Sequence, residues 1–291
     1  MAKRTLQELN LLDDFLFGSL VSYPKIGEAF VRELLTTIFG KRFENLTIIP
    51  QKTYYGSDTE LHGARLDVYL EASIESQDIL GNTTVYDVEP DQNDNSSDKK
   101  ALPKRMRFYH AKIDAGNLQS GENYQNLKNV VVILITPYDP FDKDYILYTV
   151  RNKCEEIPEM MYDDGACTLY LYTKGKKGDV SEALRQLLRY MEHTTRENAC
   201  NESLQNIHRM VETVKRDGRL GVEYMKVFER EQMLINKGRR EGREEGIKEG
   251  IKEGIKEGQK TELANTERER KRAEAAEREV ERLKKELEKL R

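Results

Sequence analysis

Residues 85–91 read Val-Tyr-Asp-Val-Glu-Pro-Asp, and this stretch decides how the rest of the sequence is interpreted. Apolar and acidic residues alternate along it, and the side chains of a β-strand point alternately to its two faces. We therefore expect a strand that carries Asp87, Glu89 and Asp91 on one face. The apolar side chains between them are expected on the other face.

A second strand-like run precedes it, residues 65–70, which read Arg-Leu-Asp-Val-Tyr-Leu. If the two strands pair as a hairpin around residues 77–83, Asp67 approaches the acidic row. Carboxylates so crowded repel one another unless they are protonated, solvated or bridged by a cation. Mg²⁺ and Mn²⁺ prefer such oxygen ligands, and bound there they activate water for attack on a phosphodiester. The alternative is an exposed acidic edge strand.

The sequence around these strands alternates between helical and strand-like spacing of apolar residues. Helices are predicted over Thr5–Leu20, from Pro24 to a stop at Gly40, and over about Lys99–Leu118. Strands are predicted at Leu46–Ile49, Arg65–Ile74, Thr83–Val88 and Val130–Ile135. The resulting order, α-α-β-β-β-α-β, predicts a mixed α/β domain. Later runs predict strands at Tyr145–Val150 and Cys167–Tyr172, then helices over Ser181–Tyr190, Glu202–Lys215 and Gly221–Ile235.

The predicted helix after the acidic strand is strongly basic, because it carries Lys99, Lys100, Lys104, Arg105, Arg107 and Lys112. Arg105, Tyr109 and Lys112 share one face by their spacing of three and four residues. Such a face is suited to holding phosphates beside a metal ion that cuts between them. The alternative is a solvated helix that balances the acidic residues nearby.

The C-terminal stretch differs in composition from the rest of the chain. Between Glu229 and Arg291 there are 17 acidic residues, 19 basic residues and no aromatic residue. Glycine recurs at every fourth position from Gly238 to Gly258, which favours either close approach of two helices or a weakly helical linker. Beyond it, Ala273, Ala276, Val280, Leu283, Leu287 and Leu290 follow heptad spacing. We therefore predict a homo-oligomer through residues 238–291, with a solvated single helix as the alternative.

The overall composition excludes several classes of protein. The 291 residues are 37% hydrophobic and 34% charged, with a net charge of −4, so bulk attraction to nucleic acid is not indicated. No run approaches the roughly 18 apolar residues of a membrane span, so no membrane partner is expected. Three separated cysteines favour a reducing, cytoplasmic location. The sequence has no Walker-type phosphate loop, and its four histidines are scattered.

The ordered series of motifs resembles the recombination-promoting nuclease/transposase family of the PD-(D/E)XK nuclease superfamily. The resemblance covers most of the first 250 residues. It rests on residues 12–17 (Leu-Asp-Asp-Phe-Leu-Phe), on 65–68 (Arg-Leu-Asp-Val), on 86–89 (Tyr-Asp-Val-Glu), on the spacing from Arg105-x-Arg107-x-Tyr109 through 113–115 to 132–135, and on Met225 with the Glu-Gly-rich tail.

The resemblance implies a restriction-endonuclease-like αβββαβ core with a helical extension and a charged C-terminal helical or coiled-coil tail. We expect the nuclease-like domain over residues 1–178, the extension over 179–236, a Gly-Glu-Lys repeat linker over 237–260 and a short coiled-coil-like helix over 261–291. It also implies cleavage of DNA that depends on Mg²⁺ or Mn²⁺. Asp67 and Glu89 would hold the metal, the Pro90 carbonyl would add a ligand, and Arg105, Arg107 and Lys112 would bind DNA phosphates.

One position departs from the family pattern. Two residues after the Glu, the superfamily has a Lys and this family usually a Gln, whereas this chain has Asp91. An aspartate cannot supply a positive charge, although it can accept a proton or ligate the metal in a catalytic role. The adjacent Gln92 would lie on the opposite face of the strand unless the strand bulges.

Three hypotheses about function follow. The first is a Mg²⁺-dependent DNA endonuclease linked to recombination or mobile elements, with Asp67, Glu89 and Asp91 as catalytic residues. The second is a catalytically degenerate DNA-binding or scaffold protein that assembles through its C-terminal tail. The third is a sheet-edge interaction module without a role in nucleic-acid binding.

Overall fold

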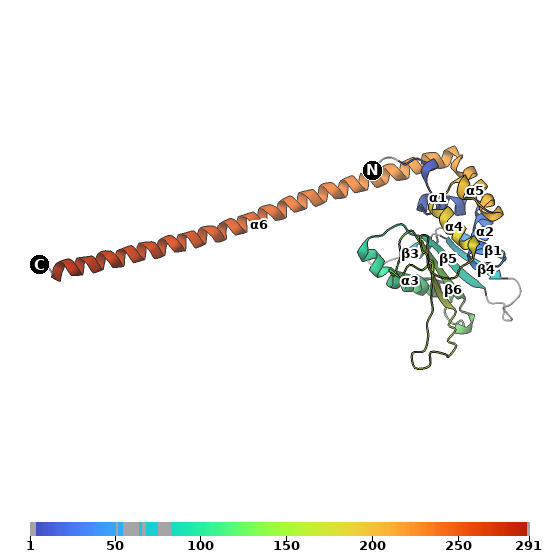
Figure 1. Cartoon of the computed structure of the whole chain (residues 1–291), viewed down its shortest axis with the longest axis horizontal. Coiled ribbons are helices and arrows are strands. Elements are labelled where there is room, and N and C mark those ends of the chain that lie inside the picture. The colour runs from blue at the N-terminus through green and yellow to red at the C-terminus, as the bar shows by residue number, and fades with distance from the viewer. Residues whose placement is uncertain (1–3, 51, 55–63, 66–67, 75–82, 290–291) are drawn as a thin grey trace. The chain divides into compact units, whose positions relative to one another are not determined.

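A six-stranded mixed sheet forms the centre of the first part of the chain, with helices on both faces (Figure 1). The computed structural model describes residues 4–50, 52–54, 64–65, 68–74 and 83–289. In spatial order the strands are β1 (Phe43–Pro50), β4 (Val68–Ile74), β5 (Thr84–Pro90), β6 (Asn129–Thr136), β8 (Ala166–Tyr172) and β7 (Leu147–Val150). Two short strands, β2 (Thr53–Tyr54) and β3 (Ala64–Arg65), pair separately. The mixed α/β class predicted from the sequence is confirmed.

Strand β5 lies where the antiparallel and parallel parts of the sheet meet. It pairs antiparallel with β4, with Val68 opposite Val88, so the predicted pairing of these two strands is confirmed. On its other edge it pairs parallel with β6, with Glu89 opposite Leu134. Because both edges of β5 are hydrogen-bonded, its side chains are held in register between two neighbours.

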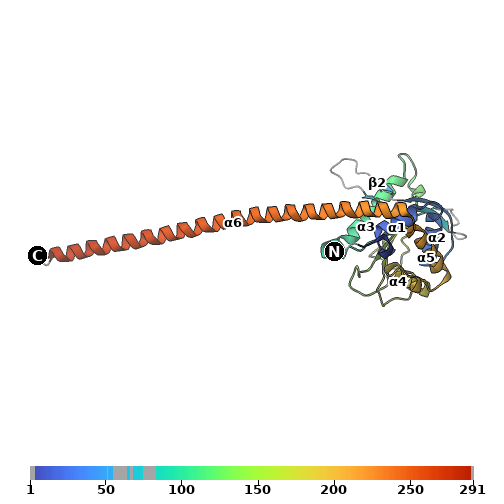
Figure 2. The same ribbon diagram turned by 90° about the horizontal axis from the view of Figure 1, so that it is seen from above.

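The helices divide between the two faces of the sheet, as Figures 1 and 2 show. On one face lie α1 (Asp14–Ser22), α2 (Gly27–Phe39), α4 (Glu182–Glu192) and α5 (Glu202–Lys215), which share one apolar core. The other face is covered by α3 (Ser96–Asn117), whose buried Leu102, Met106 and Ile113 form a second core. Within the described residues, 3₁₀ helices occur at Leu6–Glu8, Tyr124–Asn126 and Arg196–Asn198.

The end of α2 follows the predicted glycine stop. Gly40 adopts the left-handed conformation, with φ of 65°, and its N–H donates to the carbonyl of Thr36. A residue without Cβ adopts this conformation at little cost, which is why glycine commonly ends helices.

The prediction of one continuous helix over Thr5–Leu20 was wrong. The segment instead forms a 3₁₀ turn at Leu6–Glu8 and then α1, which begins at Asp14. Two carbonyls in and just after the turn form tertiary hydrogen bonds: the buried Lys215 Nζ donates to Gln7 O at 2.9 Å and to Leu9 O at 2.7 Å. The apolar spacing is preserved, but these carbonyls bond outside the segment instead of within a helix.

Contacts divide the chain into two units, Met1–Tyr224 and Met225–Arg291. Helices α4 and α5, predicted as an extension, belong to the core of the first unit. Helix α6 (Gly218–Lys289) runs without a break through the predicted linker and the predicted coiled-coil segment (Figure 2). Among the described helices, none combines the length and the apolar character needed to cross a membrane.

Candidate functional site

The acidic side chains of β5 lie on the face of the sheet that α3 covers. Asp87 is fully buried and Glu89 is 7% exposed. Val85, two residues before Asp87, packs in the core beneath α3, whereas Tyr86 and Val88 pack in the core of the opposite face. The alternation predicted from residues 85–91 is confirmed. A charged carboxylate is costly to bury, so two of them on one interior strand mark this face as a candidate site.

A polar network borders Asp87 on the β4 side. Tyr69, opposite Asp87 in the strand register, is fully buried, and its hydroxyl donates to Glu71 at 3.0 Å. Lys128 pairs with the same Glu71 at 2.7 Å. Burial raises the pKa of Glu71, but the bonds from Lys128 and Tyr69 outweigh it, and the pKa is lowered overall. Lys52 Nζ lies 3.4 Å from the centre of the Tyr69 ring.

Asp91, directly after the end of β5, is engaged by three donors. Its Oδ2 accepts from Arg105 Nη2 at 2.5 Å and from the Tyr138 hydroxyl at 3.2 Å. Its Oδ1 accepts from the backbone N–H of Asn93 at 2.8 Å. The structure therefore brings together two of the predicted residues, Asp91 and Arg105, as an ion pair.

This ion pair sets the electrostatics at the carboxyl end of β5. Burial disfavours the charged form of Arg105, but the hydrogen bond and charge of Asp91 outweigh it and raise the pKa of Arg105. Burial, together with the charge of Asp91, raises the pKa of Tyr138 far above its ordinary value. Arg105 thus stays charged and Tyr138 stays a neutral donor. The lone pairs of Asp91 are directed at these donors, which would compete with a metal ion for the carboxylate.

Sequence reasoning did not single out Tyr138. It follows the end of β6, the parallel neighbour of β5, and the carboxyl ends of parallel strands meet at one edge of a sheet. Because β5 and β6 end at the same edge, residues just after Thr136 are expected near residues just after Pro90. This reasoning would have predicted Tyr138 beside Asp91.

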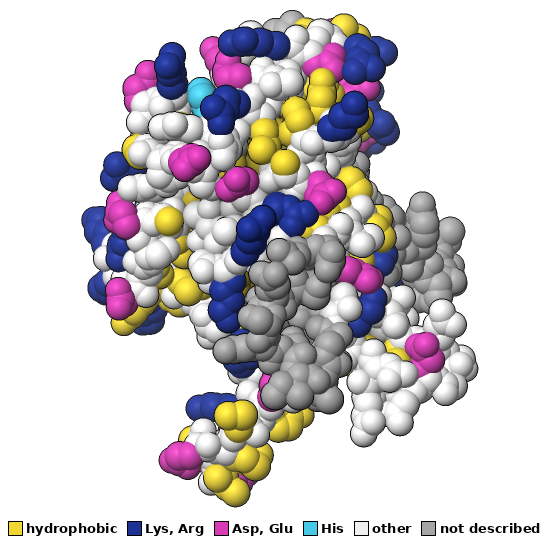
Figure 3. Space-filling view, turned by 90° about the vertical axis from the view of Figure 1, so that its right-hand side faces the viewer, with side chains coloured by type: hydrophobic (Ala, Val, Ile, Leu, Met, Phe, Trp, Pro, Cys, Tyr) yellow, Lys and Arg dark blue, Asp and Glu magenta, His cyan; other side chains and the backbone are white. Residues whose placement is uncertain are grey.

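The other predicted residues that the structure describes are not partners in this ion pair. Arg107 is exposed on α3, and Lys112 Nζ lies 5.4 Å from the centre of the Phe108 ring. Pro90 is buried as the last residue of β5. Asp67 lies outside the described residues. On the face drawn in Figure 3, basic and acidic side chains are interspersed, in keeping with the small net charge.

Gln92 points away from the acidic face. Its Nε2 donates at 2.8 Å to the carbonyl of Leu12, which belongs to the core on the opposite side of the sheet. The expectation that a one-residue shift reverses the face is confirmed. Gln92 therefore does not take the place that the family usually gives to a Gln two residues after the Glu.

A partly buried histidine lies on α3 further along the same face. His110 Nε2 and Thr168 Oγ1 of β8 are 2.9 Å apart. Burial lowers the pKa of His110 from its ordinary value of 6.5, and the charge of Asp164 only partly opposes the effect. Imidazole is thus neutral here at neutral pH, and its charged form is disfavoured by the fold.

This shift predicts a pH dependence of stability. Because the folded pKa is lower, the unfolded chain binds more protons as pH falls below 6.5, and stability is lost until the folded pKa is passed. We expect His110→Gln, which keeps a hydrogen-bonding group, to flatten this loss between about pH 7 and pH 5. Urea unfolding at several pH values measures it. Exposed His193→Gln is the control for removing a histidine, and an unchanged slope in His110→Gln would contradict the assignment.

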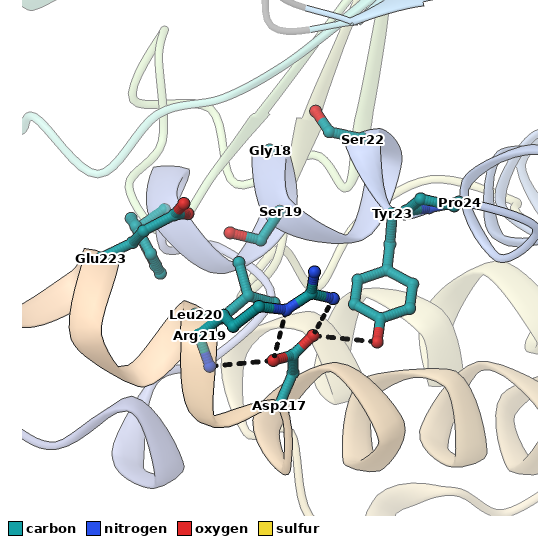
Figure 4. Close-up of a pocket in the computed structure, with 10 residues that line it drawn as sticks. Gly18, Ser19, Ser22, Tyr23, Pro24, Asp217, Arg219, Leu220 and Glu223 are labelled. Carbon is teal, nitrogen blue, oxygen red and sulfur yellow. Dashed lines mark hydrogen bonds and ion pairs between the residues drawn. The ribbon is translucent and has the colours of Figure 1, made fainter.

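A separate hollow of about 430 Å³ lies between α1 and the first turn of α6 (Figure 4). Asp217 occupies its floor and caps α6 by accepting from the N–H of Arg219 at 2.9 Å. The side chain of Arg219 and the hydroxyl of Tyr23 also donate to Asp217, at 3.0 and 3.1 Å. The bonds from Arg219 lower the pKa of Asp217 to about 2. These groups join α6 to α1 and satisfy one another, so the hollow is a weaker candidate than the acidic face.

Two further observations bear on the site. Within the described residues, no group of three or more His, Cys, Asp or Glu side chains lies close enough to hold a metal ion. Comparisons with protein-family models, with curated proteins and with solved structures found no match.

Proposed function

We propose that the chain is a divalent-metal-dependent DNA endonuclease with a restriction-endonuclease-like core, related to the recombination-promoting nuclease/transposase family. The observation that carries the proposal is the burial of Asp87 and Glu89 on one face of β5, an interior strand flanked by an antiparallel and a parallel neighbour. Leaving aside the separate pair β2 and β3, the order α1, α2, β1, β4, β5, α3, β6 also supports it, since it accommodates an αβββαβ core.

Glu89 and Asp67 are the proposed metal ligands. Asp67 immediately precedes Val68, and Val68 pairs with Val88, which immediately precedes Glu89. The donor set fits a hard cation, because carboxylate oxygens are the ligands that Mg²⁺ and Mn²⁺ prefer, with the Pro90 carbonyl as a further candidate. When bound, the metal would supply activation of water and stabilisation of the departing oxyanion.

The sequence-based expectation is that all three of Arg105, Arg107 and Lys112 bind phosphate, and the structure suggests different roles for them. The charge of Arg105 is already paired with Asp91. The exposed Arg107, and Lys112 beyond it, are then the better candidates for phosphate contacts on α3. The Arg105 guanidinium would instead hold Asp91 and keep positive charge at the position where the family pattern has Lys or Gln.

One observation favours the second candidate function, a catalytically degenerate DNA-binding or scaffold protein. The chain lacks the Lys or Gln of the family pattern, and the Asp91 in its place is engaged by Arg105, Tyr138 and Asn93. A protein that has lost the group orienting the attacking water would keep the fold and lose the reaction.

A plasmid-cleavage assay with and without metal distinguishes the endonuclease from the degenerate DNA-binding protein. We expect the purified chain to nick supercoiled plasmid in Mg²⁺ or Mn²⁺ and to leave it intact in EDTA, because carboxylates alone do not generate hydroxide at neutral pH. Agarose-gel conversion of supercoiled to open-circular or linear DNA measures it. Binding of DNA without cleavage in either metal would support the degenerate protein, and no DNA affinity even at low salt would support the sheet-edge module.

A further inference from the structure

The last three turns of the described part of α6 expose an apolar stripe. Val280, Leu283 and Leu287 are 51%, 50% and 65% exposed. With Ala273 and Ala276 they occupy alternating steps of three and four residues, the a and d positions of a heptad. We call these five residues the seam. On an isolated helix such a stripe stays in contact with water, which is unfavourable.

The charges of the same segment are sorted by heptad position. Three ion pairs along the helix join b and f positions, which face away from the seam: Lys271 with Glu267, Arg278 with Glu274, and Lys285 with Glu281. By contrast, Arg272, Glu277 and Lys284, at the g and e positions beside the seam, make no salt bridge within the described helix. The outer face is therefore paired internally. Of the charges that flank the seam, Glu279 pairs with Arg282 of its own helix at 3.0 Å, whereas Arg272, Glu277 and Lys284 are available to a facing helix.

These flanking charges are complementary to a second copy of the same helix. In a parallel coiled coil, each g residue faces the e residue five positions later on the partner helix. Arg272 would face Glu277 of the second copy, and Glu279 would face Lys284. The sequence continues the pattern with Glu286 and Arg291. In the parallel arrangement every such pair is attractive. In an antiparallel arrangement, g residues face g residues and e residues face e residues. Two antiparallel helices that cross at this segment would therefore bring Glu279 against Glu279, or Lys284 against Lys284, and both pairs are repulsive.

The surface of the helix at the seam also fits a second copy of the same helix. A hollow of about 440 Å³ lies on the helix surface, lined by Ala276, Glu277, Val280, Glu281 and Lys284. The small Ala276 side chain opens it at a d position, where a coiled coil receives a side chain of the facing helix. β-Branched Val280 at a, with Leu283 at d, is the combination that favours two strands.

We infer that residues 272–289 form a parallel two-stranded coiled coil with a second copy of this chain, in register along the seam. The inference narrows the self-association predicted for residues 238–291 to its last part. It does not depend on the proposed nuclease activity, because it uses only residues of the second unit.

Sedimentation velocity of the full chain tests the inference. We expect twice the monomer mass at high micromolar concentration, with dissociation on dilution because the seam spans only about two and a half heptads. Val280→Asp/Leu283→Asp should weaken dimerisation by about tenfold or more, since it places unpaired charges in the seam. The matched control, Leu263→Asp/Ala275→Asp, adds the same charges to the same helix off the seam and should leave the dimer unchanged. A chain that stays monomeric, forms larger assemblies or responds equally to both variants overturns the inference.

Two further variants test pairing and orientation. Lys284→Glu should weaken the dimer through repulsion by Glu279 of the partner, and the swap Glu279→Lys/Lys284→Glu should restore it. In a Cys154→Ser/Cys200→Ser background, Leu283→Cys should form a disulfide-linked dimer on oxidation, because d positions of parallel helices face each other. A dimer that resists this cross-link, or a swap that fails to rescue, would overturn the parallel register.

Discussion

Glu89→Gln is expected to lower metal-dependent nicking of plasmid by more than about a hundredfold. Loss of a group that merely supports a metal ligand costs about 10–100-fold, so loss of a direct ligand should exceed that range. The substitution keeps the size of a side chain that is only 7% exposed, so the packing beneath α3 should survive. Initial rates of supercoiled-plasmid conversion in Mg²⁺ measure the effect.

A binding readout separates loss of the metal from loss of the fold. A ligand that binds only the folded state raises the melting temperature, so Mg²⁺ should stabilise the natural chain and not Glu89→Gln. Without metal, Glu89→Gln should still unfold in one cooperative transition, because the amide keeps the size of the carboxylate. Exposed Glu155→Gln is the matched control and should retain both nicking and metal stabilisation. Full activity in Glu89→Gln would remove Glu89 from the site.

Phe17→Ala is expected to lower the free energy of unfolding by about 3–5 kcal/mol. Phe17 is fully buried in α1 and meets the ring of Phe30 in α2 edge-on, with centroids 5.6 Å apart. The truncation removes that contact and leaves a cavity between two helices that share the core of the first unit. A loss of this size is a large part of the about 5–15 kcal/mol by which domains are stable.

Chemical denaturation of the two proteins measures this loss. Met161→Ala, at a side chain 90% exposed, is the control and should change stability by less than about 0.5 kcal/mol. A change below about 1 kcal/mol in Phe17→Ala would mean that α1 and α2 do not pack as described. The comparison also tests whether the N-terminal helices belong to the same cooperative unit as the sheet.

The N-terminal segment shows which features of a helix can be predicted from the sequence. Phe17 lies in a helix whose apolar spacing is visible in the sequence, whereas the N-terminal start of that helix is not. The carbonyls of Gln7 and Leu9 bond to Lys215, more than two hundred residues away, and this shortens the helix predicted for the segment. A local pattern cannot reveal a partner so distant in the chain.

Helix α3 gives a second example of tertiary control. Its predicted range was close to the observed Ser96–Asn117, yet it contains Pro103, which removes a hydrogen bond inside a helix. Leu102 and Met106, on either side of that proline, are buried against the sheet. Packing of these two side chains offsets the local penalty, so the basic helix continues to Arg105 and beyond.

The sequence by itself determined the order of the main strands and of the helices between them, the alternation of Asp87 and Glu89 with Tyr86 and Val88, and the heptad spacing near the C-terminus. Each of these is a periodicity of residues close together in the chain, set by the geometry of one strand or one helix. Only the tertiary structure decided that Asp91 pairs with Arg105 and Tyr138, and that Gln92 bonds to Leu12 on the opposite side of the sheet. Those contacts join segments that are brought together by the sheet and its two cores. The spacing of residues within one segment does not encode which distant side chain will contact it.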